Sequence, residues 1–109
     1  SKLKQTYSYM PVTHIITKKE INNIYILSNN YPNPFNPSTL INYSIPSQSI
    51  VTLKIFDVLG REVSVLVNKE QPQGNYKIEF DASNLTSGVY FYRIQAGDFV
   101  ETKKMILMK

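Results

Sequence analysis

Apolar and polar residues alternate along most of the chain, after a first stretch of about twenty residues that has no regular period. Side chains of a β-strand point to opposite faces in turn, so strict alternation predicts half-buried strands. The expected strands are 39–45, 50–57, 63–67, 75–81, 89–96 and 99–108. The spacing typical of an amphipathic helix is missing, so the pattern predicts an all-β chain.

Three of these strands have a clean apolar row that we expect to face a core. The rows are Ile41, Tyr43 and Ile45, then Val51, Leu53 and Ile55, and then Tyr76, Ile78 and Phe80. Lys77 and Glu79 alternate with the third row and are expected to face solvent. One buried face per strand is typical of antiparallel sheets packed face to face.

Turn residues separate the strands at short intervals. The stretch "DVLGRE", 57–62, predicts a hairpin in which Gly60 supplies a positive φ and Asp57 accepts hydrogen bonds. Polar runs predict loops at 68–74 and 83–88, and "GD" predicts a tight turn at 97–98. About seven short strands with such turns indicate an antiparallel β-sandwich, similar in architecture to immunoglobulin and fibronectin type III domains.

The segment "NNYPNPFNPST", 29–39, contains three prolines. Each proline lacks a backbone N–H and biases the preceding residue toward an extended conformation, which predicts a stiff lead-in that does not pair with a strand. Phe35 is expected to insert beneath the first sheet as an apolar plug. The segment would mark the border between an irregular N-terminal stretch and a compact domain.

Length and composition fit one domain, since the chain has 109 residues and is 42% hydrophobic. We expect residues 1–23 to be a linker or the tail of a preceding cargo domain, and residues 24–109 to be the folded unit. The sequence has no apolar run of the roughly 18 residues that span a bilayer, so membrane insertion is not expected. Cysteine is absent, which excludes disulfides and thiolate chemistry.

The net charge of +4 does not indicate a nucleic-acid partner. Residues 1–20 carry +3 and residues 100–109 carry +2, whereas residues 21–99 carry −1. A phosphate-binding face needs Lys and Arg gathered across the folded body. The basic residues of this chain are instead concentrated near its two ends.

A search for catalytic and metal-binding side chains finds little. His14 is the only histidine and lies in the irregular first stretch, so a solvent-exposed linker residue is the simpler interpretation. Asp57 and Asp81 could form a carboxylate pair, but solvated turn carboxylates are the simpler interpretation. The asparagines before and between the prolines could offer oxygens to calcium, or simply form turns. We expect no enzymatic activity and no cofactor.

Aromatic residues near the end of the chain leave two interpretations open. Tyr90 and Tyr92 share one face of their strand and Phe91 lies on the other. Exposed rings on a sandwich would suit a carbohydrate-binding module of a secreted glycosidase, whereas buried rings would belong to the core of the last hairpin. The lysines of the final strand fit the role of gatekeepers at a sheet edge, and an unpaired final strand would permit an edge-to-edge homodimer.

The order of four motifs carries a specific resemblance. They are "NYPNPFNPST" at 30–39, "DVLGRE" at 57–62, "SGVYFYR" at 87–93 and "ETKKMILMK" at 101–109. Together they resemble the type A C-terminal sorting domain of the type IX (Por) secretion system of Bacteroidetes-like bacteria, over about residues 24–109. The domain is also similar to the immunoglobulin-like domain of flagellar hook-capping proteins.

The resemblance implies a non-catalytic sorting signal. The family's cargo crosses the periplasm, is recognised at the outer-membrane translocon and reaches the cell surface or medium, and a sortase-like peptidase commonly cuts before the domain. The sorting-motif residues that it implies are Pro32, Asn33, Pro34, Asp57, Gly60, Arg61, Gly88, Tyr90, Lys103, Lys104 and Lys109. We expect loss of the last residues, "KKMILMK", to abolish export while most of the sandwich still folds.

Overall fold

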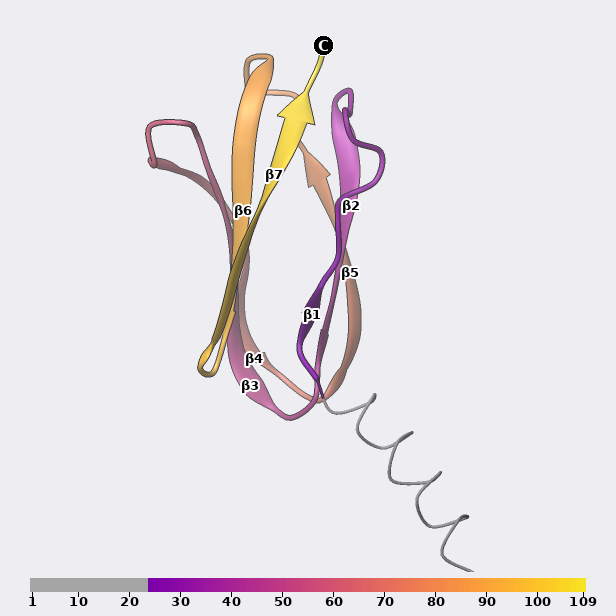
Figure 1. Cartoon of the computed structure of the whole chain (residues 1–109), viewed down its shortest axis with the longest axis vertical. Coiled ribbons are helices and arrows are strands. Elements are labelled where there is room, and N and C mark those ends of the chain that lie inside the picture. Colours follow the sequence, from indigo (N-terminus) through magenta and orange to yellow (C-terminus); the bar gives the residue numbers. More distant parts are fainter. Residues whose placement is uncertain (1–23) are drawn as a thin grey trace, which may run out of the picture.

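The computed structural model describes residues 24–109 as two antiparallel sheets that face each other (Figure 1). Residues 1–23, with His14 and the expected linker, lie outside the described residues. The strands are β1 (Ile26–Leu27), β2 (Ser38–Ile45), β3 (Ser49–Phe56), β4 (Glu62–Gln71), β5 (Gly74–Asp81), β6 (Gly88–Ala96) and β7 (Phe99–Leu107). None of the described residues forms a helix that could span a membrane.

One sheet has the strand order β1-β2-β5 and the other has the order β4-β3-β6-β7. Every neighbouring pair of named strands is antiparallel. The connections β2 to β3, β4 to β5 and β5 to β6 cross from one sheet to the other, as in immunoglobulin-like sandwiches. The predicted all-β sandwich of about seven strands is therefore confirmed.

The core lies between the sheets and is built from the alternating apolar rows. The rows of β2 and β3 are buried throughout, and in β5 Phe80 is buried while Tyr76 and Ile78 are half-buried. Tyr76 stacks on Tyr43 of β2, its partner in the strand register, with ring centroids 5.2 Å apart. Alternation alone therefore predicted the inward faces correctly.

The predicted loop at 68–74 is too long, because β4 continues to Gln71 and β5 begins at Gly74. The polar end of β4 pairs with the start of β3, from Thr52 opposite Asn68 to Ser49 opposite Gln71. Residues 68–71 are of types that favour turns, but they form the end of the edge strand β4 and hydrogen-bond to β3 through their backbone. Side-chain polarity does not reveal such backbone pairing. Strand β1 has only two residues and also gives no periodic signal.

The proline-rich segment is packed, and the prediction that it does not pair is wrong. Tyr31 and Leu40 exchange both backbone hydrogen bonds at 3.0 Å, and Phe35 forms a parallel bridge with Leu107 at the end of β7. Residues before, between and after the prolines keep their N–H groups, and these make the bonds. The Phe35 plug is confirmed, since its side chain is buried and its ring lies 6.2 Å from that of Phe80.

Candidate functional site

The antiparallel order of the strands brings the sequence motifs to one end of the sandwich. β3 ends and β4 begins there, β6 begins there, and β7 ends there (Figure 1). The segment around Phe35 joins the same end through its bridge to Leu107. We call this the motif end. Strand β1 and the turn between β6 and β7 lie at the opposite end.

The turn between β3 and β4 is held by the carboxylate of Asp57. One oxygen accepts the backbone N–H groups of Leu59 and Arg61, each at 2.9 Å, and the other accepts the Arg61 Nε–H at 2.8 Å. The Arg61 N–H, then its side chain, then the Leu59 N–H stabilise the ionised form and lower the pKa of Asp57. Gly60 has φ +82°, a conformation that residues with a Cβ rarely adopt. The predicted turn is confirmed.

Tyr90 anchors the opposite side of this end. Its ring is buried, and its hydroxyl donates to the Thr86 carbonyl at 2.7 Å, so that the loop before β6 is tied to the strand. A tyrosine at the start of such a strand that bonds back to the preceding loop is the tyrosine corner of immunoglobulin-like sandwiches. Gly88 begins β6 with φ +155°.

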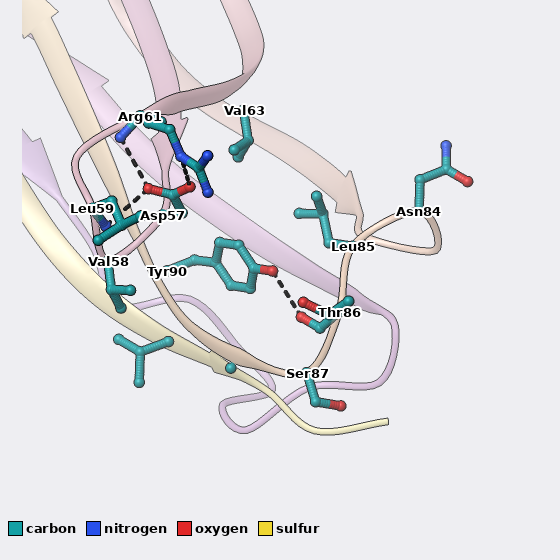
Figure 2. A pocket seen from close by; sticks show the side chains of 12 residues that line it. Asp57, Val58, Leu59, Arg61, Val63, Asn84, Leu85, Thr86, Ser87 and Tyr90 are labelled. Atoms are coloured by element: carbon teal, nitrogen blue, oxygen red, sulfur yellow. Dashed lines mark hydrogen bonds and ion pairs between the residues drawn. The ribbon is translucent and has the colours of Figure 1, made fainter.

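A groove of about 400 Å³ lies between the Asp57 turn and the loop that Tyr90 anchors. Figure 2 shows Tyr90 between the turn on one side and Leu85, Thr86 and Ser87 on the other. Val58 and Leu59 form an apolar rim, with 65% and 74% of their surface exposed. The second and third motifs therefore share one groove. Val58 and Leu59 were not predicted, although two large apolar residues at a turn tip are an unusual sequence feature.

The first motif lies at the edge of β7. Thr39 and the side chain of Asn30 donate to the Pro32 carbonyl at 2.8 and 3.2 Å. The side-chain oxygen of Asn33 accepts the backbone N–H of Ile106 at 3.0 Å. Pro32, Asn33 and Pro34 are themselves exposed, so these backbone contacts fix an outward-facing turn. The side-chain oxygen of Asn33 thus has a structural role at the edge of β7.

The lysines of the last motif separate into two groups. Lys109 joins the motif end, where its ammonium donates to the Ser83 carbonyl at 2.6 Å and its N–H donates to the Ser87 hydroxyl at 3.0 Å. Lys103 and Lys104 do not, because they lie in the middle of β7 opposite Tyr92 and Phe91. Lys103 faces inward and its ammonium lies 3.5 Å from the carboxylate of Glu101.

The end of β7 is also less open than we expected. Phe35 donates its N–H to the Ile106 carbonyl at 3.0 Å and accepts the Met108 N–H at 2.9 Å. Met105 and Leu107 are buried in the core. The structure therefore contradicts the expectation that the sandwich mostly folds without its last seven residues, since these include two core side chains.

Asp57 and Asp81 make their hydrogen bonds within separate turns. Asp81 accepts the hydroxyl of Ser83 and its N–H, the latter at 2.9 Å. These bonds, with the nearby charge of Lys109, lower the pKa of Asp81. A general acid needs a raised pKa, so two carboxylates with lowered pKa values suit turn formation better than acid–base chemistry. Residues 24–109 contain no group of three acidic, histidine or cysteine side chains that could hold a metal ion.

The aromatic side chains of β6 belong mainly to the core. Tyr90 and Tyr92 are buried, and the Tyr92 hydroxyl donates to the Ser28 carbonyl at 2.7 Å and accepts the Asn30 N–H at 2.9 Å. Burial, partly opposed by the bond from Asn30, raises the pKa of Tyr92. These rings cannot stack on a sugar, which removes the observation that suggested a carbohydrate-binding module.

Comparison with known proteins agrees with this architecture. A family model described as a secretion system C-terminal sorting domain matches residues 29–108, a span that contains the three internal motifs and nearly all of the last. No curated protein sequence matched the chain. The family supplies the sorting signal of type IX secretion, which exports proteins to the cell surface or medium, and is in general not catalytic. The chain therefore belongs to the family of type IX secretion system C-terminal sorting domains.

Proposed function

We propose that residues 24–109 are the address that directs an attached N-terminal cargo through the outer-membrane type IX translocon. Cargo and address reach the translocon from the periplasm, and the domain acts there as a ligand and not as an enzyme. The observation that carries the proposal is the gathering of the family motifs at one end of the sandwich. A single receptor surface could contact them together.

The groove at the motif end has the properties of a recognition surface. Apolar side chains in a preformed cleft contribute most to binding when the backbone around them is already ordered. The three bonds to the carboxylate of Asp57 order the turn that carries Val58 and Leu59. The bond from Tyr90 to Thr86 orders the facing loop. We propose that the translocon inserts an apolar side chain between them.

The test is export of a reporter fused to residues 1–109 in a bacterium that has this secretion system. Replacing Val58 and Leu59 by serine should stop export, so that the fusion is retained in the periplasm. The fusion should still fold, because both side chains are exposed. The matched control replaces Ile50 and Val100 by serine. These residues are 67% and 53% exposed and lie near the starts of β3 and β7, at the opposite end, so the control should be exported normally. Equal export of both double variants would contradict the proposed surface.

We further propose that residues 1–23 are the linker in which a sortase-like peptidase separates cargo from the sorting domain. Strand β1 begins at the end opposite the motif end, so recognition and cleavage would occur at different ends of the domain. Mass spectrometry of the exported cargo should find a new C-terminus within residues 1–23. A C-terminus inside residues 24–109 would contradict this boundary.

A further inference from the structure

The four edges of the two sheets differ in how well they are protected against pairing with another strand. β1 is only two residues long, and the β3–β4 ladder contains two register shifts that make β4 irregular. β7 is covered at its end by Asn33 and Phe35, and it turns the charged pair Glu101 and Lys103 inward. Short strands, bulges and inward charges are the usual devices that keep an edge from pairing.

β5 has none of these devices. Its register with β2 is unbroken from Asp81 opposite Ser38 to Gly74 opposite Ile45, and it contains no proline. β5 is the last strand of its sheet, so within residues 24–109 its outer backbone edge has no strand partner. On the core side, Tyr76 and Ile78 remain half-exposed at this edge. A regular edge with partly covered apolar side chains can accept another strand.

We propose that β5 pairs with β5 of a second copy of the chain, antiparallel and centred on Ile78. The charges of the strand carry this inference, because the pairing is self-complementary: Lys77 of each copy lies opposite Glu79 of the other. The two exposed faces then make two equivalent ion pairs across the strands. On the core side Ile78 meets its counterpart, and Tyr76 meets Phe80.

Other registers that keep the core sides together are less favourable. Centring on Lys77 or on Glu79 places that charge opposite itself, and centring on Phe80 places Glu79 opposite Asp81. Like charges directly opposite on neighbouring strands are destabilising, and opposite charges are stabilising. Only the register centred on Ile78 therefore pairs Lys77 with Glu79 in both copies, and it places Asp81, the third charged residue of the exposed row, opposite the uncharged Asn75. It merges two three-stranded sheets into one, and the motif end of each copy stays uncovered.

Reversing one charge should weaken the homodimer. Lys77→Glu makes positions 77 and 79 both acidic and Glu79→Lys makes them both basic, so each variant would face itself with like charges at these two positions. For the full chain of 109 residues, sedimentation equilibrium at low salt should show dimerisation at least about tenfold weaker in either variant. Both side chains are exposed, so circular dichroism should show unchanged folding.

Mixing the two variants provides the decisive measurement. The acidic positions 77 and 79 of Lys77→Glu complement the basic positions 77 and 79 of Glu79→Lys, so an equimolar mixture should form heterodimers more tightly than either variant dimerises alone. Added salt should weaken the wild-type dimer and relieve the repulsion within each variant. Lys69→Glu and Glu70→Lys, which make the same charge changes at exposed positions of the β4 edge, are the matched controls and should dimerise like wild type.

Several outcomes would overturn the proposal. They are a wild-type chain that stays monomeric at the highest soluble concentration, a mixture that associates no better than its components, and β4 controls that lose dimerisation as the β5 variants do. The result is independent of export, because the variants leave the motif end unchanged. Normal export of a reporter fused to either β5 variant would support the proposed sorting function. The sedimentation measurements alone decide whether the dimer forms.

Discussion

Thr39 and Asn30 are polar residues in the interior, and together they shape the turn at Pro32. Thr39 donates its hydroxyl to the Pro32 carbonyl at 2.8 Å and accepts the Asn30 side-chain amide at 3.1 Å. The N–H of Asn30 is bound by the hydroxyl of Tyr92. Buried polar groups need partners, so this small network stabilises the backbone path between β1 and β2, and only the side-chain oxygen of Asn30 is left without a partner within the described residues.

Replacing Thr39 by valine should lower the free energy of unfolding by about 1–3 kcal/mol, because it removes two buried hydrogen bonds that each contribute about 0.5–1.5 kcal/mol, while the Asn30 amide still donates to the Pro32 carbonyl. The shape of the side chain is nearly kept, so the loss reports hydrogen bonding and not packing. Urea unfolding followed by circular dichroism measures it. Thr102→Val, at an exposed position of β7, is the control and should change stability by less than about 0.5 kcal/mol. Equal losses in both variants would contradict the role of the network.

Tyr43 should make the domain sensitive to alkali. Burial, partly opposed by the hydrogen bond to Gln71, raises the pKa of Tyr43 to about 12. The unfolded phenol titrates near 10, so the folded state keeps its proton between about pH 10 and 12. The contribution that this pKa difference makes to the free energy of unfolding is fully present below about pH 10 and is lost as the pH rises toward 12.

With Tyr43→Phe, the free energy of unfolding should therefore fall less steeply with pH in this alkaline interval. The substitution also leaves the buried side chain of Gln71 without its partner, so stability at neutral pH should be lower than in wild type. Denaturant unfolding at a series of pH values compares the two slopes. Tyr31→Phe is the control, since its exposed ring should leave the slope as in wild type. A slope for Tyr43→Phe that matches wild type would refute the prediction.

The proline-rich segment and the end of β7 act as one structural element. Asn33 and Phe35 bind Ile106 and Met108 on the edge of β7 that β6 leaves free. This edge would otherwise present unpaired backbone groups next to the motif end. The prolines thus flank the residues that close the sheet, which explains why a segment unsuited to a central strand is placed there.

Asn33→Ala should make the Ile106 amide exchange with solvent deuterium roughly fivefold faster, since it removes the acceptor of that amide at a net cost of about 1 kcal/mol. Exchange followed by NMR resolves the single amide. Asn36→Ala changes a second exposed asparagine of the segment and should leave Ile106 protected. If both variants expose Ile106 equally, its protection does not depend on the Asn33 side chain.

For the molecule as a whole, the end of the chain both completes the core and forms part of the motif end, and a useful deletion must remove only one of these two parts. Met105 and Leu107 complete the core, whereas Met108 and Lys109 are exposed and lie at the motif end. A truncation that removes both groups cannot tell a lost recognition surface from a lost fold. The structure therefore defines which shorter truncation is informative.

Deleting residues 105–109 should unfold the domain, because each lost core side chain costs about 2–5 kcal/mol against a total stability of roughly 5–15 kcal/mol. Deleting residues 108–109 should leave a cooperative thermal transition, because both side chains are exposed. Circular dichroism melts distinguish the two. A non-cooperative transition after the shorter deletion would show that Lys109 and its bonds to the 83–87 loop are essential for folding.

The candidate site was predicted only in part. The Asp57–Gly60–Arg61 turn follows from residue types that favour turns, and it was found correctly. Its meeting with Tyr90 across a groove, and the apolar rim of Val58 and Leu59, depend on which strands neighbour each other and could not be read from local sequence. Lys103 and Lys104 belong to the same motif as Lys109 but lie in the middle of β7. An extended strand rises about 3.3 Å per residue, so residues five or six positions apart are far apart along it.

Alternation along the chain was sufficient to establish an all-β protein, the inward rows of β2 and β3, and the turn at Asp57. These are local properties, since a period of two and the preference of Gly and Asp for turns act within a few residues. The tertiary structure alone decided that polar residues 68–71 belong to β4, that Phe35 closes the edge of β7, and that β5 keeps a regular free edge. Backbone pairing between distant segments decides these features, and every residue but proline can both donate and accept in it.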